Sequence, residues 1–254
     1  DRSPSRGLGD VYKRQAYEQS SDQEVAFQAV DYILRVLKKN MVFGMTWGRA
    51  MHEFVEQLAK DERLRSLSFQ NVKVVPFLGT PGAIQSDSWN TTTYSNTLAT
   101  KVGNLLHCAS YNLSAPMYVE GTKEKELIES IDEIAKVLHM AETADIALIG
   151  IGSMQDDSSI IKAEIRTKEE YKELVRKGAV GEIVGRIYDK NGQTVDEYLK
   201  RKMVGISLDK IAKIPVRVGM SYGKDKIEAI KGAIAGGLVN VLVTDVPTAE
   251  LLLK

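Results

Sequence analysis

The sequence predicts an α/β fold, a three-layer Rossmann-like parallel sheet, and two observations support it. Short apolar runs with almost no polar alternation, such as "VKVVPFLG" and "DIALIGIG", are typical of strands that are buried on both faces. Segments with apolar residues at helical spacing alternate with these runs. Strands and helices that alternate in this way form a parallel sheet covered on two sides. We therefore expect one such domain within the 254 residues.

The elements follow one another in a regular order. A helix is expected first, because apolar residues recur at helical spacing from Val25 to Leu37 and Asp22 is a suitable N-cap. Strands are expected at 41–45, 72–79, 145–152, 214–220 and 238–245. Helices are expected at 48–61, 94–109, 124–144 as one long or two short helices, 224–237 and 248–254.

The stretch from 165 to 209 is less regular. Within it, "GAVGEIVGRIYDKNGQTVD" contains strand-sized pieces, several glycines and a turn at Asn191 and Gly192 of the kind that hairpins favour. We interpret it as an inserted hairpin that lies over the sheet.

Charge and cysteine content exclude several classes of protein. Lys plus Arg and Asp plus Glu both number 34, so no overall charge draws the chain to nucleic acid or to an anionic membrane. No apolar stretch is long enough to span a membrane. The single cysteine, Cys108, cannot form an internal disulfide, which suits a reducing cytoplasm.

Residues 1–15, "DRSPSRGLGDVYKRQ", have no amphipathic period and no apolar centre like that of a signal peptide. They resemble translated linker sequence, and we interpret them as a non-native segment that precedes a domain at 16–254; a native flexible arm is the alternative.

Ligands of parallel α/β sheets bind beyond the carboxyl ends of the strands, where loops lead into helix N-termini. The first such loop, "GMTWGRAM", offers backbone N–H groups and a helix dipole to an anion. Gly48 permits close approach, Thr46 can donate its hydroxyl and Arg49 can donate charge-assisted hydrogen bonds. The alternative is that Thr46 caps the helix and Trp47 packs in the core.

Three later loops follow the same rule. The second carries Gly79, Thr80 and Gly82 in a long polar loop after a buried strand. The third, "GIGSMQDDSS", lacks the last glycine of a dinucleotide fingerprint, and the sequence contains no P-loop. In the fourth, Lys224 and Lys226 oppose the dipole at a predicted helix start, a conflict that a bound anion would remove, although a solvated lysine pair is the alternative.

Metal and cofactor chemistry is not expected. The three histidines, His52, His107 and His139, have no ligand spacing and lie in predicted helices, and Cys108 lies in an apolar run. We therefore expect no metal, no cofactor and no catalytic residue.

Five segments in this order resemble the effector-binding domain of SorC-type bacterial transcriptional regulators, over roughly 22–254: "GMTWGRAM", "LSAPMYVE", "ADIALIGIGSM", "GAVGEIVGRIYDKNG" and the stretch from "IPVRVGMSYGKDK" to "TAELLL". The resemblance implies a fold similar to those of sugar-phosphate isomerases and glucosamine-phosphate deaminases. It also implies a sugar-phosphate effector, a homodimer or homotetramer, and operator DNA bound through an N-terminal helix-turn-helix domain that we expect to be missing here.

The resemblance also implies roles for single residues. Thr46, Gly48, Arg49 and Lys226 would bind the phosphate, and Gly79 and Thr80 would line the second loop. Glu182 and Asp189 would bond sugar hydroxyls. Ala50 departs from the pattern, because many relatives carry Ser or Thr there.

Two other functions stay open. One is an isomerase or deaminase-like enzyme on the same fold, with Asp189 or Glu182 as the base but no histidine near a strand end to assist it. The other is an oligomerisation module whose pocket no longer binds a ligand, which Ala50 would allow.

Overall fold

The computed structural model describes residues 21–81, 91–156, 158–162 and 165–254. Its main sheet has six parallel strands in the order β3-β2-β1-β4-β8-β9. The strands are β3 (Ala109–Ser110), β2 (Lys73–Pro76), β1 (Val42–Met45), β4 (Ile146–Gly150), β8 (Val216–Met220) and β9 (Val241–Val243). The predicted Rossmann-like parallel sheet is therefore confirmed.

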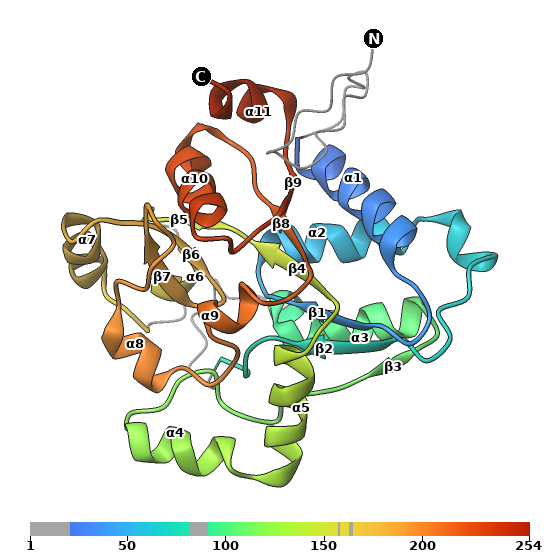
Figure 1. Ribbon diagram of the computed structural model, residues 1–254, viewed down its shortest axis with the longest axis horizontal. Coiled ribbons are helices and arrows are strands. Elements are labelled where there is room, and N and C mark those ends of the chain that lie inside the picture. Colours follow the sequence, from blue (N-terminus) through green and yellow to red (C-terminus); the bar gives the residue numbers. More distant parts are fainter. Residues whose placement is uncertain (1–20, 82–90, 157, 163–164) are drawn as a thin grey trace.

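Helices cover both faces of this sheet (Figure 1). On one face lie α1 (Ser21–Val36), α2 (Arg49–Leu58) and α3 (Ser95–Leu105), packed on Phe43, Met45, Ile146 and Leu148. On the other lie α5 (Asp132–Glu142), α9 (Leu208–Ile211) and α10 (Ile227–Ala235), packed in the core that contains Ala147 and Ile149. Neighbouring residues of one strand thus face opposite layers, as buried parallel strands require.

The remaining elements are short or peripheral. The expected helix at 124–144 is two helices, α4 (Thr122–Glu129) and α5. The others are α11 (Val246–Leu252), α6 (Ser159–Lys162), α7 (Lys168–Arg176), α8 (Glu197–Lys202) and the 3-10 turns Glu62–Arg65, Thr91–Thr93 and Lys224–Lys226.

Gly44 lies in the middle of β1 because the ring of Phe77 packs directly against it. A Cβ atom at Gly44 would lie 1.9 Å from Cε1 of Phe77, which is fully buried. We expect Gly44→Ala to lower the free energy of unfolding by about 1–3 kcal/mol, since overpacking a filled core forces its neighbours to move. Urea denaturation measures this loss. Gly121→Ala is the control, because its Cβ would meet nothing closer than 3.5 Å; an equal loss in both variants would contradict the prediction.

The predicted hairpin is present as a second, antiparallel sheet of β5 (Gly152–Ser153), β6 (Ala179–Ile183) and β7 (Arg186–Asp189). The turn that joins β6 to β7 is Val184 and Gly185, both with positive φ, as two-residue hairpin turns favour. Asn191 and Gly192 form a further turn that returns the chain to β7. The hairpin packs against α10, and it lies at the side where β4 ends.

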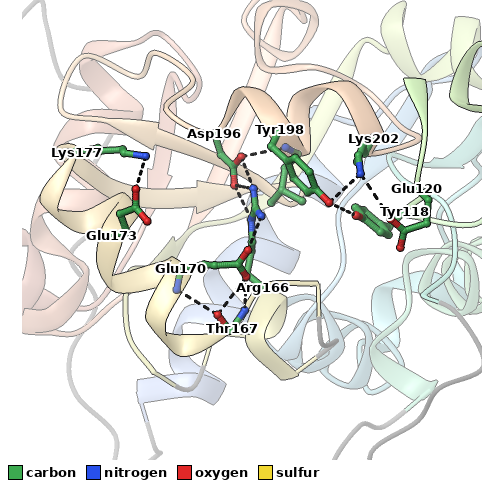
Figure 2. Close-up of polar contacts among 11 residues, drawn as sticks. Tyr118, Glu120, Arg166, Thr167, Glu170, Glu173, Lys177, Asp196, Tyr198 and Lys202 are labelled. Atoms are coloured by element: carbon green, nitrogen blue, oxygen red, sulfur yellow. Dashed lines mark hydrogen bonds and ion pairs between the residues drawn. The ribbon is translucent and has the colours of Figure 1, made fainter. Parts of the chain in front are cut away.

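Two helices in the irregular stretch, α7 and α8, and the short α9 at its end were not predicted. A buried ion pair joins the first two: Arg166 Nη2 lies 2.7 Å from Asp196 Oδ1, and the two side chains are 10% and 3% exposed. Asp196 also caps α8 by accepting from the Leu199 N–H, and Arg166 bonds Glu170 of α7 (Figure 2). The ion pair therefore holds the chain before the hairpin, at Arg166, to the chain after it, at Asp196.

Candidate functional site

A cavity of about 370 Å³ opens at the carboxyl ends of three neighbouring strands, β1, β4 and β8. It is the position where parallel α/β sheets bind ligands. Its walls come from the loops after these strands, from the hairpin and from α6. They consist of Trp47, Gly48, Arg49, Ala50, Gly150, Ile151, Gly152, Ser153, Ser158, Lys162, Glu182, Met220, Ser221, Tyr222, Gly223, Asp225 and Lys226.

The N-terminus of α2 forms the first wall. Gly48 is its N-cap, with φ 105° and ψ 177°, a backbone conformation that glycine adopts most readily. No side chain caps the helix among the described residues, and its first turn carries no acidic residue. Arg49, the first helical residue, is exposed on the cavity wall. An anion here would meet the first-turn amides of α2, the positive end of the helix dipole and a guanidinium group.

Thr46 lies beneath the cavity and does not line it. Its side chain is 1% exposed, and Oγ1 accepts a hydrogen bond of 3.0 Å from the Gly150 N–H. Thr46 therefore neither caps α2 nor faces a ligand; it connects the end of β1 to the end of β4 and supports the cavity floor.

Lys226 enters from the loop after β8. Its Nζ donates to Ser153 Oγ at 2.9 Å, and Ser153 Oγ lies 3.2 Å from Asp225 Oδ2. The ammonium group is 3.8 Å from the same carboxylate. Lys224, the other lysine of this loop, is not among the cavity residues. Of the two lysines at this predicted helix start, only Lys226 lines the cavity.

Glu182 of β6 supplies a buried carboxyl group from the hairpin. It is 7% exposed, accepts from the Gly185 N–H and from the Trp47 side chain, and faces Lys226. Burial raises the pKa of Glu182 to about 7, although these three partners oppose the rise. A Cβ atom at Gly152 would lie 2.8 Å from Glu182 Oε2, so glycine there lets the carboxyl group reach the cavity.

Gly79 and Thr80 lie after β2, and neither lines this cavity. The Gly79 N–H donates to the Val204 carbonyl, and Thr80 Oγ1 accepts from the Asn96 side chain at 2.7 Å. Gly82 lies outside the described residues. The second predicted loop therefore does not meet the first and fourth at this cavity.

Asp189 is also outside the cavity. Its Oδ1 accepts from the N–H groups of Asn191 and Gln193, each at 2.9 Å. The structure thus uses this carboxylate to form the turn after β7, and of the two hairpin carboxylates only Glu182 is brought to Arg49 and Lys226.

Sequence reasoning missed several cavity residues, among them Ser153, Lys162, Ser221 and Tyr222. All but Lys162 lie in strand-end loops that the sequence already singled out, but loop position does not say which side chains face inward. No group of three metal-binding side chains occurs in the part of the chain that the structure describes. Over the same residues, no helix is long and apolar enough to cross a membrane.

Comparison with known proteins identifies the family. Residues 11–254 match the family model described as "Putative sugar-binding domain". The sorbitol operon regulator of Klebsiella pneumoniae is 30% identical over 222 residues, which cover 87% of this chain and 67% of that protein. The chain belongs to the SorC family. The transcriptional regulator LsrR of Escherichia coli is likewise 30% identical, over 89% of this chain and 67% of LsrR.

Solved structures agree with this SorC-family assignment. Full-length SorC of Klebsiella pneumoniae superimposes with a TM-score of 0.80 at 27% identity, over 92% of this chain and 74% of that one. A DeoR-family regulator of Listeria monocytogenes gives 0.81 at 23% identity, over 96% and 92%, and shows the shared fold. The chain is therefore the sugar-binding domain of a SorC-type transcriptional regulator, as its motifs implied.

Proposed function

We propose that this SorC-family domain senses a phosphorylated sugar in the cavity between β1, β4 and β8. The observation that supports the proposal is that groups suited to an anion and to hydroxyls line the same cavity. The uncapped start of α2 with Arg49, the ammonium group of Lys226 and the buried carboxyl group of Glu182 come from distant parts of the sequence and line one cavity.

Different walls of the cavity suit the two ends of a sugar phosphate. Amides of the first turn of α2 and the Arg49 guanidinium suit phosphate oxygens. Glu182, Ser153 and Asp225 suit sugar hydroxyls, since carboxylates accept from hydroxyl groups and serine both donates and accepts. Lys226, bonded to Ser153 at 2.9 Å, lies where it can bond either end. Ala50 offers no hydroxyl, so the amides and cations would hold the phosphate without one.

The charges of the cavity also favour an anion. Arg49, Lys162 and Lys226 are cationic, whereas Glu182 and Asp225 are the carboxyl groups. Since the pKa of Glu182 is about 7, this group is partly neutral near neutral pH. The cavity then carries a net positive charge, which a phosphate would neutralise.

The proposed output is control of operator binding by a DNA-binding domain elsewhere in the regulator, without turnover of the sugar. A ligand changes such an equilibrium only if it binds one arrangement of the protein better than another. We propose that the arrangements are those of a homodimer or homotetramer, which sedimentation at micromolar protein would test.

A second function, an isomerase-like enzyme on the same fold, is favoured by one observation. The buried carboxyl group of Glu182, with a pKa of about 7, has the property of a general base. None of the three histidines lines the cavity to act as its partner.

A thermal-shift screen of the 254-residue chain tests the proposal with inorganic phosphate, glucose 6-phosphate, fructose 6-phosphate, ribose 5-phosphate and the corresponding free sugars. A ligand at a hundred times its Kd should add about 2.7 kcal/mol to the free energy of unfolding. We expect at least one sugar phosphate to stabilise the chain more than its free sugar does. Equal effects of phosphorylated and free sugars would contradict the phosphate site, and conversion of a bound sugar would favour the enzyme.

A further inference from the structure

Tyr222 connects the cavity with the first helix of the described chain. Its side chain lines the cavity in the loop after β8. Its hydroxyl donates a hydrogen bond to Oδ1 of Asp22, 200 positions away in the sequence and in the first turn of α1. The ring is partly buried against the core cluster that contains the inner face of α1. Tyr222 therefore contacts both the ligand space and α1.

The loop that carries Tyr222 is anchored on both sides of it. Ser221 Oγ donates to the Ile151 carbonyl at 3.1 Å, at the end of β4. The Gly223 N–H donates to Thr248 Oγ1 of α11 at 2.8 Å, and Thr248 is 2% exposed. Because the backbone is held at both neighbours, a ligand that contacts this wall acts mainly on the orientation of the Tyr222 side chain.

The helix that receives this contact also packs on the opposite wall. α1 lies along α2, whose N-terminus carries Gly48 and Arg49, and it contacts β8 and β9 as well (Figure 1). Asp22 itself does not line the cavity. Any effect of Asp22 on ligand binding must therefore be transmitted by its neighbours, and among the described contacts the hydrogen bond to Tyr222 leads directly to a residue that lines the cavity.

We propose that Tyr222 transmits occupancy of the cavity to α1: a ligand packed against its ring stabilises the hydrogen bond to Asp22 and with it the first turn of α1. This inference rests on the proposed sugar-phosphate site. The coupling is reciprocal, because a contact that a ligand strengthens must in turn strengthen binding of that ligand. Ligand binding would thus change the stability of α1, the first helix of the described chain.

Calorimetric titration of the 254-residue chain with the same four phosphates tests the reciprocity. Tyr222→Phe keeps the ring and removes the hydroxyl, and Asp22→Ala removes the acceptor outside the cavity. We expect each variant to raise the Kd of the tightest-binding probe about fivefold or more, the lower range of allosteric coupling. The double variant should raise it no further than either single one, because both remove the same contact.

Glu24→Ala is the matched control, since it also truncates an acidic side chain of the first turn of α1. The Kd of this control variant for the same probe should stay within about twofold of the wild-type value. Hydrogen exchange provides the second measurement: the probe should slow exchange of the amides of 22–30 in the wild type and not in Tyr222→Phe.

The outcomes separate the two proposals. If the wild type binds none of the phosphates, the proposed function fails and this inference fails with it. If the wild type binds a probe but Asp22→Ala binds it as tightly as the Glu24→Ala control does, the site stands and the transmission through Tyr222 is overturned. Additive losses in the double variant would likewise overturn it.

Discussion

Replacing Arg49 with alanine is expected to raise the Kd of a sugar phosphate by about ten- to a hundredfold. The guanidinium lines the cavity at the start of α2 and forms no ion pair with the side chains that the structure describes, so its N–H groups can donate to a ligand. A hydrogen bond to a charged group contributes about 1.5–3 kcal/mol, and every 1.4 kcal/mol changes Kd tenfold. Calorimetric titration measures the change directly.

Lys226→Ala should weaken binding in the same way, because Lys226 is the ammonium group that faces Glu182 and Ser153. The same loop supplies the control: Lys224→Ala removes an identical charge two positions away, from a residue that does not line the cavity. Equal Kd values for the two lysine variants would show that overall charge, rather than this site, attracts the ligand.

The second large effect concerns pH. The pKa of Glu182 is raised from 4.5 to about 7, chiefly by burial. In the folded chain the carboxyl group therefore keeps its proton between about pH 4.5 and 7, where the unfolded chain has lost it. Because the folded state binds more protons in this window, the contribution of Glu182 to stability falls as the pH rises through it.

Glu182→Gln should remove this dependence, since glutamine stays neutral. We expect the variant to gain stability relative to the wild type between pH 5 and pH 8, by up to a few kcal/mol, because one pKa unit corresponds to about 1.4 kcal/mol. Urea denaturation of both proteins without ligand at the two pH values measures the difference. A difference that is constant with pH would show that the carboxyl group titrates normally.

The same titration affects the ligand. Ionised Glu182 places a negative charge beside the proposed phosphate and sugar ends, so affinity for a phosphate ester should fall above about pH 7 in the wild type relative to Glu182→Gln. Comparing the two proteins at each pH cancels the ionisation of the phosphate itself.

Much of the fold could be predicted because periodicity reports burial. Val74, Val75, Ala147 and Leu148 lie in runs that lack polar alternation, and a strand with two buried faces can have no other pattern. The helices α7 and α8 escaped prediction although local signals existed. Thr167 and Glu170 form a capping box, and Asp196 caps α8, but the glycine-rich strands around them dominated the interpretation.

The sequence predicted which loops surround the candidate site, but it did not predict which residues of those loops line it. Gly48, Arg49, Glu182 and Lys226 line one cavity, whereas Thr46 lies under it. Asp189 and Thr80 had the same appearance in the sequence, a polar side chain near a strand end. Both instead bond neighbouring groups of the protein.

The amino-acid pattern was therefore sufficient for the sheet, for the end of the sheet at which the cavity lies, and for the family. Local spacing carries that information, because burial of a strand or the start of a helix depends on near neighbours in the chain. The placement of Arg49 and Glu182 on one cavity, and the contact of Tyr222 with Asp22, depend on packing between residues more than a hundred positions apart. Such contacts arise only when strand order and packing place these loops side by side, and no local pattern encodes them.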